Sequence, residues 1–156
     1  MLARFPVTAY VGLGANLGDP QATILKAMND LALIQGVTES KRSSLYRTAP
    51  VEASGPDYVN AVVQVRTVLT APALLAQLQA LEQGAGRERS FHNAPRTLDL
   101  DLLSYGEARI QSKQLTIPHP RMAQRAFVLV PLAEIAPQAV TAEQLRAVQS
   151  QSLERL

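Results

Sequence analysis

The sequence predicts an α+β fold. Three observations support this prediction: segments in which apolar and polar residues alternate, two segments with an apolar stripe at helical spacing, and the order in which these segments follow one another. That order is strand, helix, strand, strand, helix, strand, as in a ferredoxin-like βαββαβ sandwich with a mainly antiparallel sheet. Because 156 residues suit one hydrophobic core, we expect residues 1–156 to form a single domain.

The first predicted strand covers residues 7–13, in which apolar and polar side chains alternate. It leads into a glycine-containing turn at residues 14–18. A helix follows, because Asp19 can cap its first turn and Pro20 suits the first helical position. We expect this helix to end at Gly36.

Two further strands are predicted next. Residues 38–47 are polar and partly alternating, which indicates a strand followed by a loop rich in proline and glycine. Residues 58–67 are rich in β-branched residues, with small apolar side chains at the odd positions. Tyr58 and Asn60 therefore share the other face of this strand.

The second helix begins after Thr70 with the same pattern of cap and proline, and should end near Gly84 and Gly86. Gln79 and Glu82 are three residues apart and hence neighbours on one face of this helix. Without a ligand, that face would simply be the solvent face.

The two central helices should pack on the sheet, and a C-terminal helical extension should follow the last predicted strand. Residues 127–136 are apolar enough to form a buried helix despite Pro131. Thr141 and Gln144 have the spacing of a capping box, which predicts a short last helix.

Asp99 and Asp101 alternate with leucines between Leu98 and Leu102. In an extended strand the two carboxylates share one face, roughly 7 Å apart, while the leucines face the core. A divalent cation such as Mg²⁺ would remove the repulsion between the carboxylates. The simpler interpretation is a half-exposed strand with solvated aspartates.

Positive charge is concentrated just before this strand. The formal net charge is only +2, but arginine outnumbers lysine twelve to three, and Arg87, Arg89 and Arg96 fall within ten residues. Guanidinium groups suit phosphates, so arginines beside a metal site indicate a polyphosphate ligand. As ordinary loop residues they would be solvated. The low net charge argues against a nucleic-acid partner.

The composition also bears on location. The sequence contains no cysteine, which excludes disulfides, and no apolar run of about 18 residues, the length that a membrane helix needs. We therefore expect neither export nor membrane insertion, and a cytoplasmic location.

A set of short motifs agrees with one known family in order and spacing. The motifs are Gly14-Ala15-Asn16-Leu17-Gly18, Tyr46-Arg47-Thr48-Ala49-Pro50, Asp57-Tyr58-Val59-Asn60-Ala61, Gly86-Arg87-Glu88-Arg89, Pro95-Arg96-Thr97-Leu98-Asp99-Leu100-Asp101, and Pro118-His119-Pro120-Arg121-Met122 with Arg125 and Phe127. With them, nearly the whole chain resembles 6-hydroxymethyl-7,8-dihydropterin pyrophosphokinase, an enzyme family of folate biosynthesis.

The resemblance implies an ATP-dependent diphosphokinase. Such an enzyme transfers the terminal diphosphate of ATP to the hydroxymethyl oxygen of the reduced pterin and releases AMP, without a covalent enzyme intermediate. By resemblance, Asp99 and Asp101 bind two Mg²⁺ ions, and Arg87, Arg89 and Arg96 act with them in catalysis. The implied partners are ATP and 6-hydroxymethyl-7,8-dihydropterin, and we expect a monomer.

The resemblance also implies which residues contact each substrate. Those implied for ATP are Gln79, Glu82, Arg89, Arg96, Leu102, Thr116, His119 and Arg125. Those implied for the pterin are Thr48, Pro50, Val51, Tyr58, Asn60 and Phe127. Without the resemblance, His119 would be an exposed loop residue, and Tyr58 and Phe127 would be ordinary core aromatics.

The chain departs from the family pattern at several positions. Ala15 stands where members commonly have serine, Ala49 where proline is frequent, and Pro120 where certain relatives have an aromatic residue. The arginine-rich loop is one residue shorter than in some members, and has Phe91 and His92 where a tryptophan occurs.

Three other functions fit parts of the sequence. A ligand-sensing module could use the same fold, but it has no need of paired carboxylates beside arginines. An RNA-binding domain would need aromatic residues on its central strands and a more basic face. An ordinary kinase would transfer the γ-phosphoryl group and release ADP, but the sequence has no G-x-x-x-x-G-K-[ST] loop.

Overall fold

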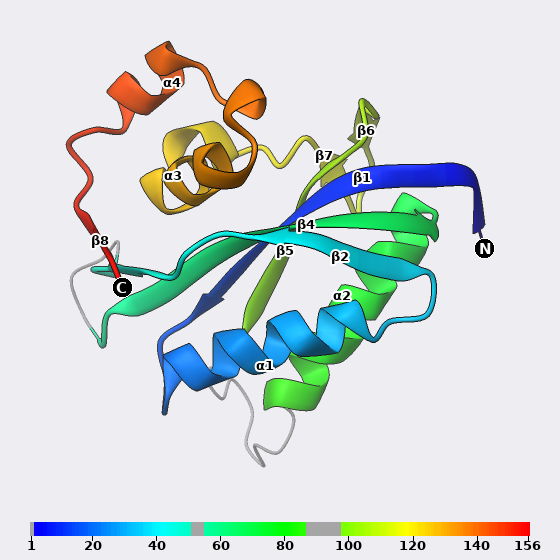
Figure 1. Cartoon of the computed structure of the whole chain (residues 1–156), viewed down its shortest axis with the longest axis horizontal. Coiled ribbons are helices and arrows are strands. Elements are labelled where there is room, and N and C mark those ends of the chain that lie inside the picture. The colour runs from blue at the N-terminus through cyan, green and yellow to red at the C-terminus, as the bar shows by residue number, and fades with distance from the viewer. Residues whose placement is uncertain (1, 51–54, 87–97) are drawn as a thin grey trace.

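The computed structural model describes residues 2–50, 55–86 and 98–156 (Figure 1). The strands in these ranges are β1 (Leu2–Ala15), β2 (Val37–Arg42), β3 (Tyr46–Thr48), β4 (Tyr58–Leu69), β5 (Asp99–Tyr105), β6 (Ile110–Gln111), β7 (Thr116–Ile117) and β8 (Leu153–Arg155). The helices are α1 (Pro20–Ala32), α2 (Ala71–Gly86), α3 (Ala126–Ile135) and α4 (Ala142–Ala147), with 3₁₀ turns η1 (Met122–Gln124) and η2 (Pro137–Ala139).

An antiparallel sheet organises the molecule. Among the described residues it has six strands, in the order β5-β1-β4-β3-β8, and β2 also pairs with β4. β6 and β7 form a separate two-stranded ribbon. Each of these pairings is antiparallel, so the predicted mainly antiparallel sheet is confirmed.

Helices cover both faces of the sheet (Figure 1). α1 and α2 lie on one face, and α3 lies on the other. The first core joins the odd-numbered apolar residues of β4 to fully buried side chains of the two central helices, namely Ile24, Met28, Leu31, Leu74 and Leu78. The second core packs Val62 of β4 and Leu103 of β5 against Leu129 and Leu132 of α3. The protein is therefore a mixed α/β structure with helices packed on its sheet.

Two predicted boundaries are wrong. β1 does not end at residue 13, because Gly14 still pairs with Asn60 on β4 and with Asp99 on β5. α1 ends at Ala32, before Gly36. Gly36 has a φ of +90°, which favours glycine, and it accepts hydrogen bonds from the chain at the end of β4.

The predicted single strand at residues 38–47 forms two strands, β2 and β3. Ser43 interrupts it by bonding to the partner strand: its N–H donates to the Val62 carbonyl oxygen, and the Val62 N–H donates to Ser43 Oγ, each at 2.9 Å. β3 then continues the pairing with β4 as a separate element.

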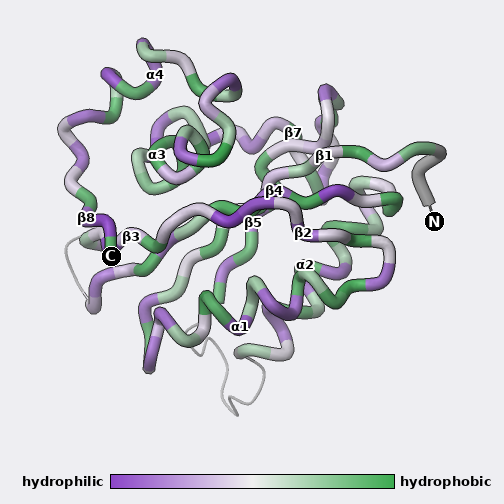
Figure 2. Tube along the Cα trace, in the orientation of Figure 1, coloured by the Kyte–Doolittle hydropathy of each residue, from purple (hydrophilic) through white to green (hydrophobic). Residues whose placement is uncertain are grey.

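The C-terminal extension contains the predicted helices and one unpredicted strand. α3 includes Pro131 in its interior, and the capping box of Thr141 and Gln144 is present at the start of α4. β8 follows and pairs with β3. The segment that leads from α4 to the C-terminus is largely hydrophilic (Figure 2). No helix in the described ranges is long and apolar enough to cross a bilayer.

Candidate active site

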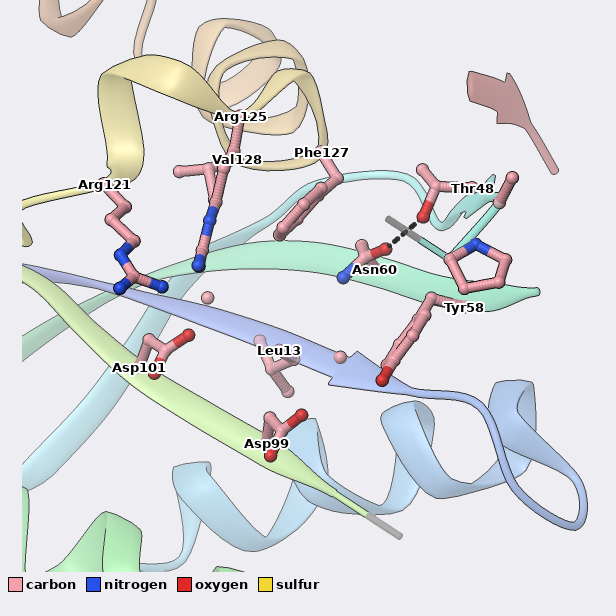
Figure 3. A pocket seen from close by; sticks show the side chains of 14 residues that line it. Leu13, Thr48, Tyr58, Asn60, Asp99, Asp101, Arg121, Arg125, Phe127 and Val128 are labelled. Carbon is pink, nitrogen blue, oxygen red and sulfur yellow. Dashed lines mark hydrogen bonds between the residues drawn. The ribbon is translucent and has the colours of Figure 1, made fainter. Parts of the chain in front are cut away.

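A cavity of about 510 Å³ opens on the face of the sheet that α3 covers (Figure 3). Its walls come from β1, β3, β4 and β5, and from the segment that begins α3. The lining residues are Gly12, Leu13, Gly14, Thr48, Ala49, Pro50, Tyr58, Asn60, Asp99, Asp101, Arg121, Arg125, Phe127 and Val128.

Two glycines of the central strand β1 form the floor of this cavity. Gly12 pairs with Asp101, and Gly14 pairs with Asp99 on one side and Asn60 on the other. Because directly opposite residues of antiparallel strands share a face, missing side chains on the central strand leave a hollow between its neighbours. A Cβ on Gly14 would lie only 2.9 Å from Asn60 Nδ2, so a larger residue there would force the Asn60 side chain to move.

Asp99 and Asp101 point from β5 into the cavity (Figure 3). The neighbouring leucines are buried in the first core, on the opposite face, so the predicted alternation is confirmed. Within the described residues, no group of three or more His, Cys, Asp or Glu could hold a metal ion. Two carboxylates nevertheless suit Mg²⁺, because this ion keeps several waters and takes substrate phosphate oxygens as further ligands.

Positive charge reaches the cavity from the segment before α3. Arg121 and Arg125 extend from this segment toward the strand that carries Asp101 (Figure 3). His119 lies beside them, and its Nδ1 accepts a hydrogen bond from the Arg121 N–H at 3.2 Å. Burial lowers the pKa of His119; Asp101 opposes this shift, and the two arginines add to it. The lowered pKa favours the neutral imidazole, so the positive charge of this wall comes from the two guanidinium groups, which suit anions.

The other end of the cavity suits a flat heterocycle. Tyr58 and Phe127 present aromatic rings there (Figure 3). Pro50 also lines the cavity. The Thr48 hydroxyl donates to Asn60 Oδ1 at 2.9 Å. Asn60 is 6% exposed, and with its oxygen engaged its amide NH₂ is the group that faces the cavity (Figure 3). Aromatic rings can stack on a flat heterocycle, and a fixed amide donor can bind an acceptor on its edge.

Several residues that the family resemblance implies for ATP do not line this cavity: Gln79, Glu82, Leu102, Thr116 and His119. Gln79 and Thr116 are exposed, and Leu102 is buried in the first core. Glu82 Oε2 accepts a hydrogen bond from the Leu100 N–H at 2.8 Å, which ties α2 to β5. Arg87, Arg89, Arg96 and Val51 lie outside the described residues.

Six lining residues carry no predicted role: Gly12, Leu13, Gly14, Ala49, Arg121 and Val128. Gly12 could have been found from the sequence, because a glycine inside a strand often marks a place where a ligand or another backbone segment comes close. Arg121 belongs to the same motif as His119, and arginine excess was evident in the composition. Val128 had no signal, since an apolar helical residue is typical of a core.

Comparisons with known proteins agree with one another. The family model for 7,8-dihydro-6-hydroxymethylpterin-pyrophosphokinase matches residues 10–137. A 2-amino-4-hydroxy-6-hydroxymethyldihydropteridine pyrophosphokinase of Synechocystis sp. is 48% identical over 129 residues, which are 83% of this chain and 66% of that protein. The enzyme of the same name from Haemophilus influenzae is 43% identical over 131 residues, covering 83% of this chain and 82% of the relative.

A solved structure shows the same fold. A crystal structure of HPPK-DHPS in complex with substrates has a TM-score of 0.71 at 14% identity, covering 94% of this chain and 43% of that chain. The present chain thus spans less than half of that longer protein.

Fold and cavity together define the class: a mixed α/β protein whose sheet carries a two-part site, with carboxylates and arginines at one end and aromatic rings with an amide at the other. The family follows from the match over residues 10–137. The chain belongs to the 7,8-dihydro-6-hydroxymethylpterin-pyrophosphokinase family, which confirms the resemblance seen in the motifs.

Proposed function

We propose that this chain transfers the diphosphate of ATP to the hydroxymethyl oxygen of 6-hydroxymethyl-7,8-dihydropterin, releasing AMP, as a step of folate biosynthesis. The observation that carries the proposal is that one cavity contains two kinds of groups, one suited to a polyphosphate and one suited to a flat ring. Asp99, Asp101 and Arg125 suit a metal-bound polyphosphate, while Tyr58 and Asn60 suit a flat heterocycle. A site for either substrate alone would need only one of these halves.

In the proposed reaction the pterin hydroxyl oxygen attacks the β-phosphorus of ATP. A new oxygen–phosphorus bond forms, and the bond from the β-phosphorus to the oxygen shared with the α-phosphorus breaks. AMP leaves with that oxygen and its electron pair, and the hydroxyl proton passes to solvent. Phe127, Tyr58 and Asn60 orient the ring, so that positioning supplies much of the rate.

Asp99 and Asp101 are the residues that would hold Mg²⁺, in the family pattern two ions. When bound, Mg²⁺ neutralises charge on the transferring and leaving phosphates. The chain itself contributes a fixed pair of carboxylates on one strand face, and Arg121 and Arg125 offer charge-assisted hydrogen bonds to phosphate oxygens.

Other roles rest on family position alone. We propose catalytic roles for Arg87, Arg89 and Arg96, and ATP contacts for Gln79, Glu82, Leu102, Thr116 and His119. Val51 is proposed as a further pterin contact.

For the whole chain, we propose one ferredoxin-like pyrophosphokinase domain over residues 1–156, acting as a cytoplasmic monomer. The order β1, α1, β2 with β3, β4, α2, β5 supports the ferredoxin-like description, as does the position of β1 between β4 and β5.

The test is to incubate the protein with ATP, Mg²⁺ and 6-hydroxymethyl-7,8-dihydropterin and to separate the products by chromatography. We expect AMP in equal amount to a diphosphorylated pterin. ADP with a monophosphorylated pterin would show γ-phosphoryl transfer instead. Binding of both ligands by folded protein without turnover would favour a ligand-sensing module.

A further inference from the structure

The C-terminal segment of residues 151–156 contacts two separate walls of the cavity. One contact is made by the side chain of Gln151. Its Oε1 accepts a hydrogen bond from the Ala126 N–H, and its Nε2 donates to the Gln124 carbonyl oxygen, each at 2.9 Å. Arg125, which precedes α3, makes no side-chain capping bond, so Gln151 satisfies the first-turn amide in its place.

The wall that Gln151 contacts carries ligand-facing residues. Arg125 and Phe127 flank Ala126 in the chain and both line the cavity. The Arg125 guanidinium carbon lies 5.4 Å from the centroid of the Phe127 ring, so the two side chains are packed as a unit. A shift of the Ala126 backbone would therefore move the aromatic wall.

The second contact is strand pairing. β8 pairs with β3 in a register that places Leu153 opposite Thr48, and the Leu156 N–H donates to the Leu45 carbonyl oxygen at 2.9 Å. β3 has only three residues, and β8 covers the edge that β4 leaves free. Thr48 at the end of β3 holds Asn60 Oδ1, so β8 supports the residue that orients the amide.

We infer that residues 151–156 act as a brace that fixes the width of the pterin end of the cavity, with Gln151 holding the Phe127 wall and β8 holding the Thr48 wall. This inference rests on the proposed function. The family match ends at residue 137, so the whole brace lies outside the matched region. Gln151 and the β8 residues are positioning residues, because none of them lines the cavity.

Two variants test the brace, each with a matched control. Gln151→Ala removes both side-chain hydrogen bonds, and its control is Gln149→Ala, at an exposed position two residues earlier. Glu154→Pro weakens the β8 pairing, because proline cannot donate to a ladder. Its control, Glu154→Ala, loses only a long and exposed ion pair with Arg47.

The readout is the dissociation constant of fluorescent 6-hydroxymethylpterin in the presence of Mg²⁺ and a non-hydrolysable ATP analogue. We expect both test variants to bind the pterin roughly fivefold more weakly, while the two controls stay within about twofold of the wild type. The affinity for the ATP analogue should stay within about twofold in Glu154→Pro, and should fall by less than the pterin affinity in Gln151→Ala, because the wall that Gln151 holds also carries Arg125. Thermal melting reports folding separately.

The outcomes separate the brace from the proposed function. Unchanged pterin affinity in both test variants would overturn the brace, whatever their melting temperatures. An equal loss of affinity for both ligands would also overturn it, since general loosening would then explain the effect. A wild type that binds no pterin would instead overturn the proposed function.

Discussion

Gly14 shapes the cavity through the side chain that it lacks. It lies on β1 between Asp99 and Asn60, and an added Cβ would stand 2.9 Å from Asn60 Nδ2. The Asn60 amide would have to move, and the move would disturb its hydrogen bond from the Thr48 hydroxyl.

We expect Gly14→Ala to raise KM for the pterin by about tenfold, with a smaller change in KM for ATP, because the displaced amide belongs to the pterin end. Gly84→Ala in α2 is the control, since nothing lies within 4 Å of its added Cβ and alanine favours a helix. Steady-state kinetics with each substrate varied in turn measures the effect. Equal changes in both KM values would contradict this account of Gly14.

Arg121 provides a second residue-scale prediction. Its guanidinium reaches the cavity near Arg125, in the half that suits phosphates. Arg121→Ala should lower kcat/KM for ATP by about tenfold or more, and Arg121→Lys should recover only part of it, because lysine lacks the planar fork. Arg146→Ala on α4 should leave the kinetics unchanged. Weaker pterin affinity with normal kcat/KM for ATP would refute the assignment.

Much of the site can be predicted from single residues and their spacing. The other site residues cannot be predicted in this way, for a physical reason. Strand alternation alone puts Asp99 with Asp101 and Tyr58 with Asn60. It cannot show that a segment far along the chain brings Arg121 over the sheet, because that contact depends on the packing of α3.

Among the elements, α3 and β3 are joined by a polar network centred on Glu134. The Glu134 carboxylate accepts hydrogen bonds from the Ser44 N–H and hydroxyl and from the Tyr46 hydroxyl, and it pairs with Arg155 at 3.4 Å. Burial would raise the pKa of Glu134, but the hydrogen bonds from Ser44 and Tyr46 outweigh it and lower the pKa. Burial, followed by the bond to Glu134, raises the pKa of Tyr46 to about 12.

These shifts predict how stability depends on pH. Because the folded-state pKa of Glu134 lies below its ordinary value of 4.5, the ionised carboxylate stabilises the fold above that pH, and this contribution is lost as the pH falls through the folded-state pKa. Glu134→Gln should therefore lower the free energy of unfolding by about 1 kcal/mol at pH 7, and the difference should shrink below pH 4.5. Urea unfolding at several pH values measures it; a difference independent of pH would argue against an ionic role.

The longer elements and the capped helix α4 can be predicted from the sequence, whereas the short strands β3 and β8 cannot. α1 and α2 have cap and proline signals and apolar stripes, and β4 alternates over its length. β3 and β8 have three residues each; β3 pairs with β4 and β8, and β8 pairs with β3. Such tertiary pairing leaves little trace in local sequence.

At the scale of the whole molecule, the two faces of the sheet have different roles. One face packs against α1 and α2 and stabilises the fold, and the other packs partly against α3 and leaves the cavity beside it. Ligands bound in the cavity would therefore contact elements that are far apart in the sequence, from β1 to α3.

Ligand binding should stabilise the whole fold. At about 100 times its dissociation constant, ATP with Mg²⁺ should raise the melting temperature by about 5 °C or more. Excess EDTA should remove most of this shift, because the carboxylate pair and the phosphates would then repel each other. Differential scanning fluorimetry measures it. A shift of equal size with EDTA would contradict a metal site at Asp99 and Asp101.

The most direct test of the central claim follows labelled phosphorus in the wild type and in Asp101→Asn. With γ-labelled ATP, Mg²⁺ and the pterin, the account predicts that the wild type moves the label to the pterin while unlabelled AMP forms. It predicts that Asp101→Asn, folded as judged by circular dichroism, transfers the label at least about 100-fold more slowly. Label on the pterin with formation of ADP, or transfer by Asp101→Asn at the wild-type rate, would contradict diphosphate transfer at this site.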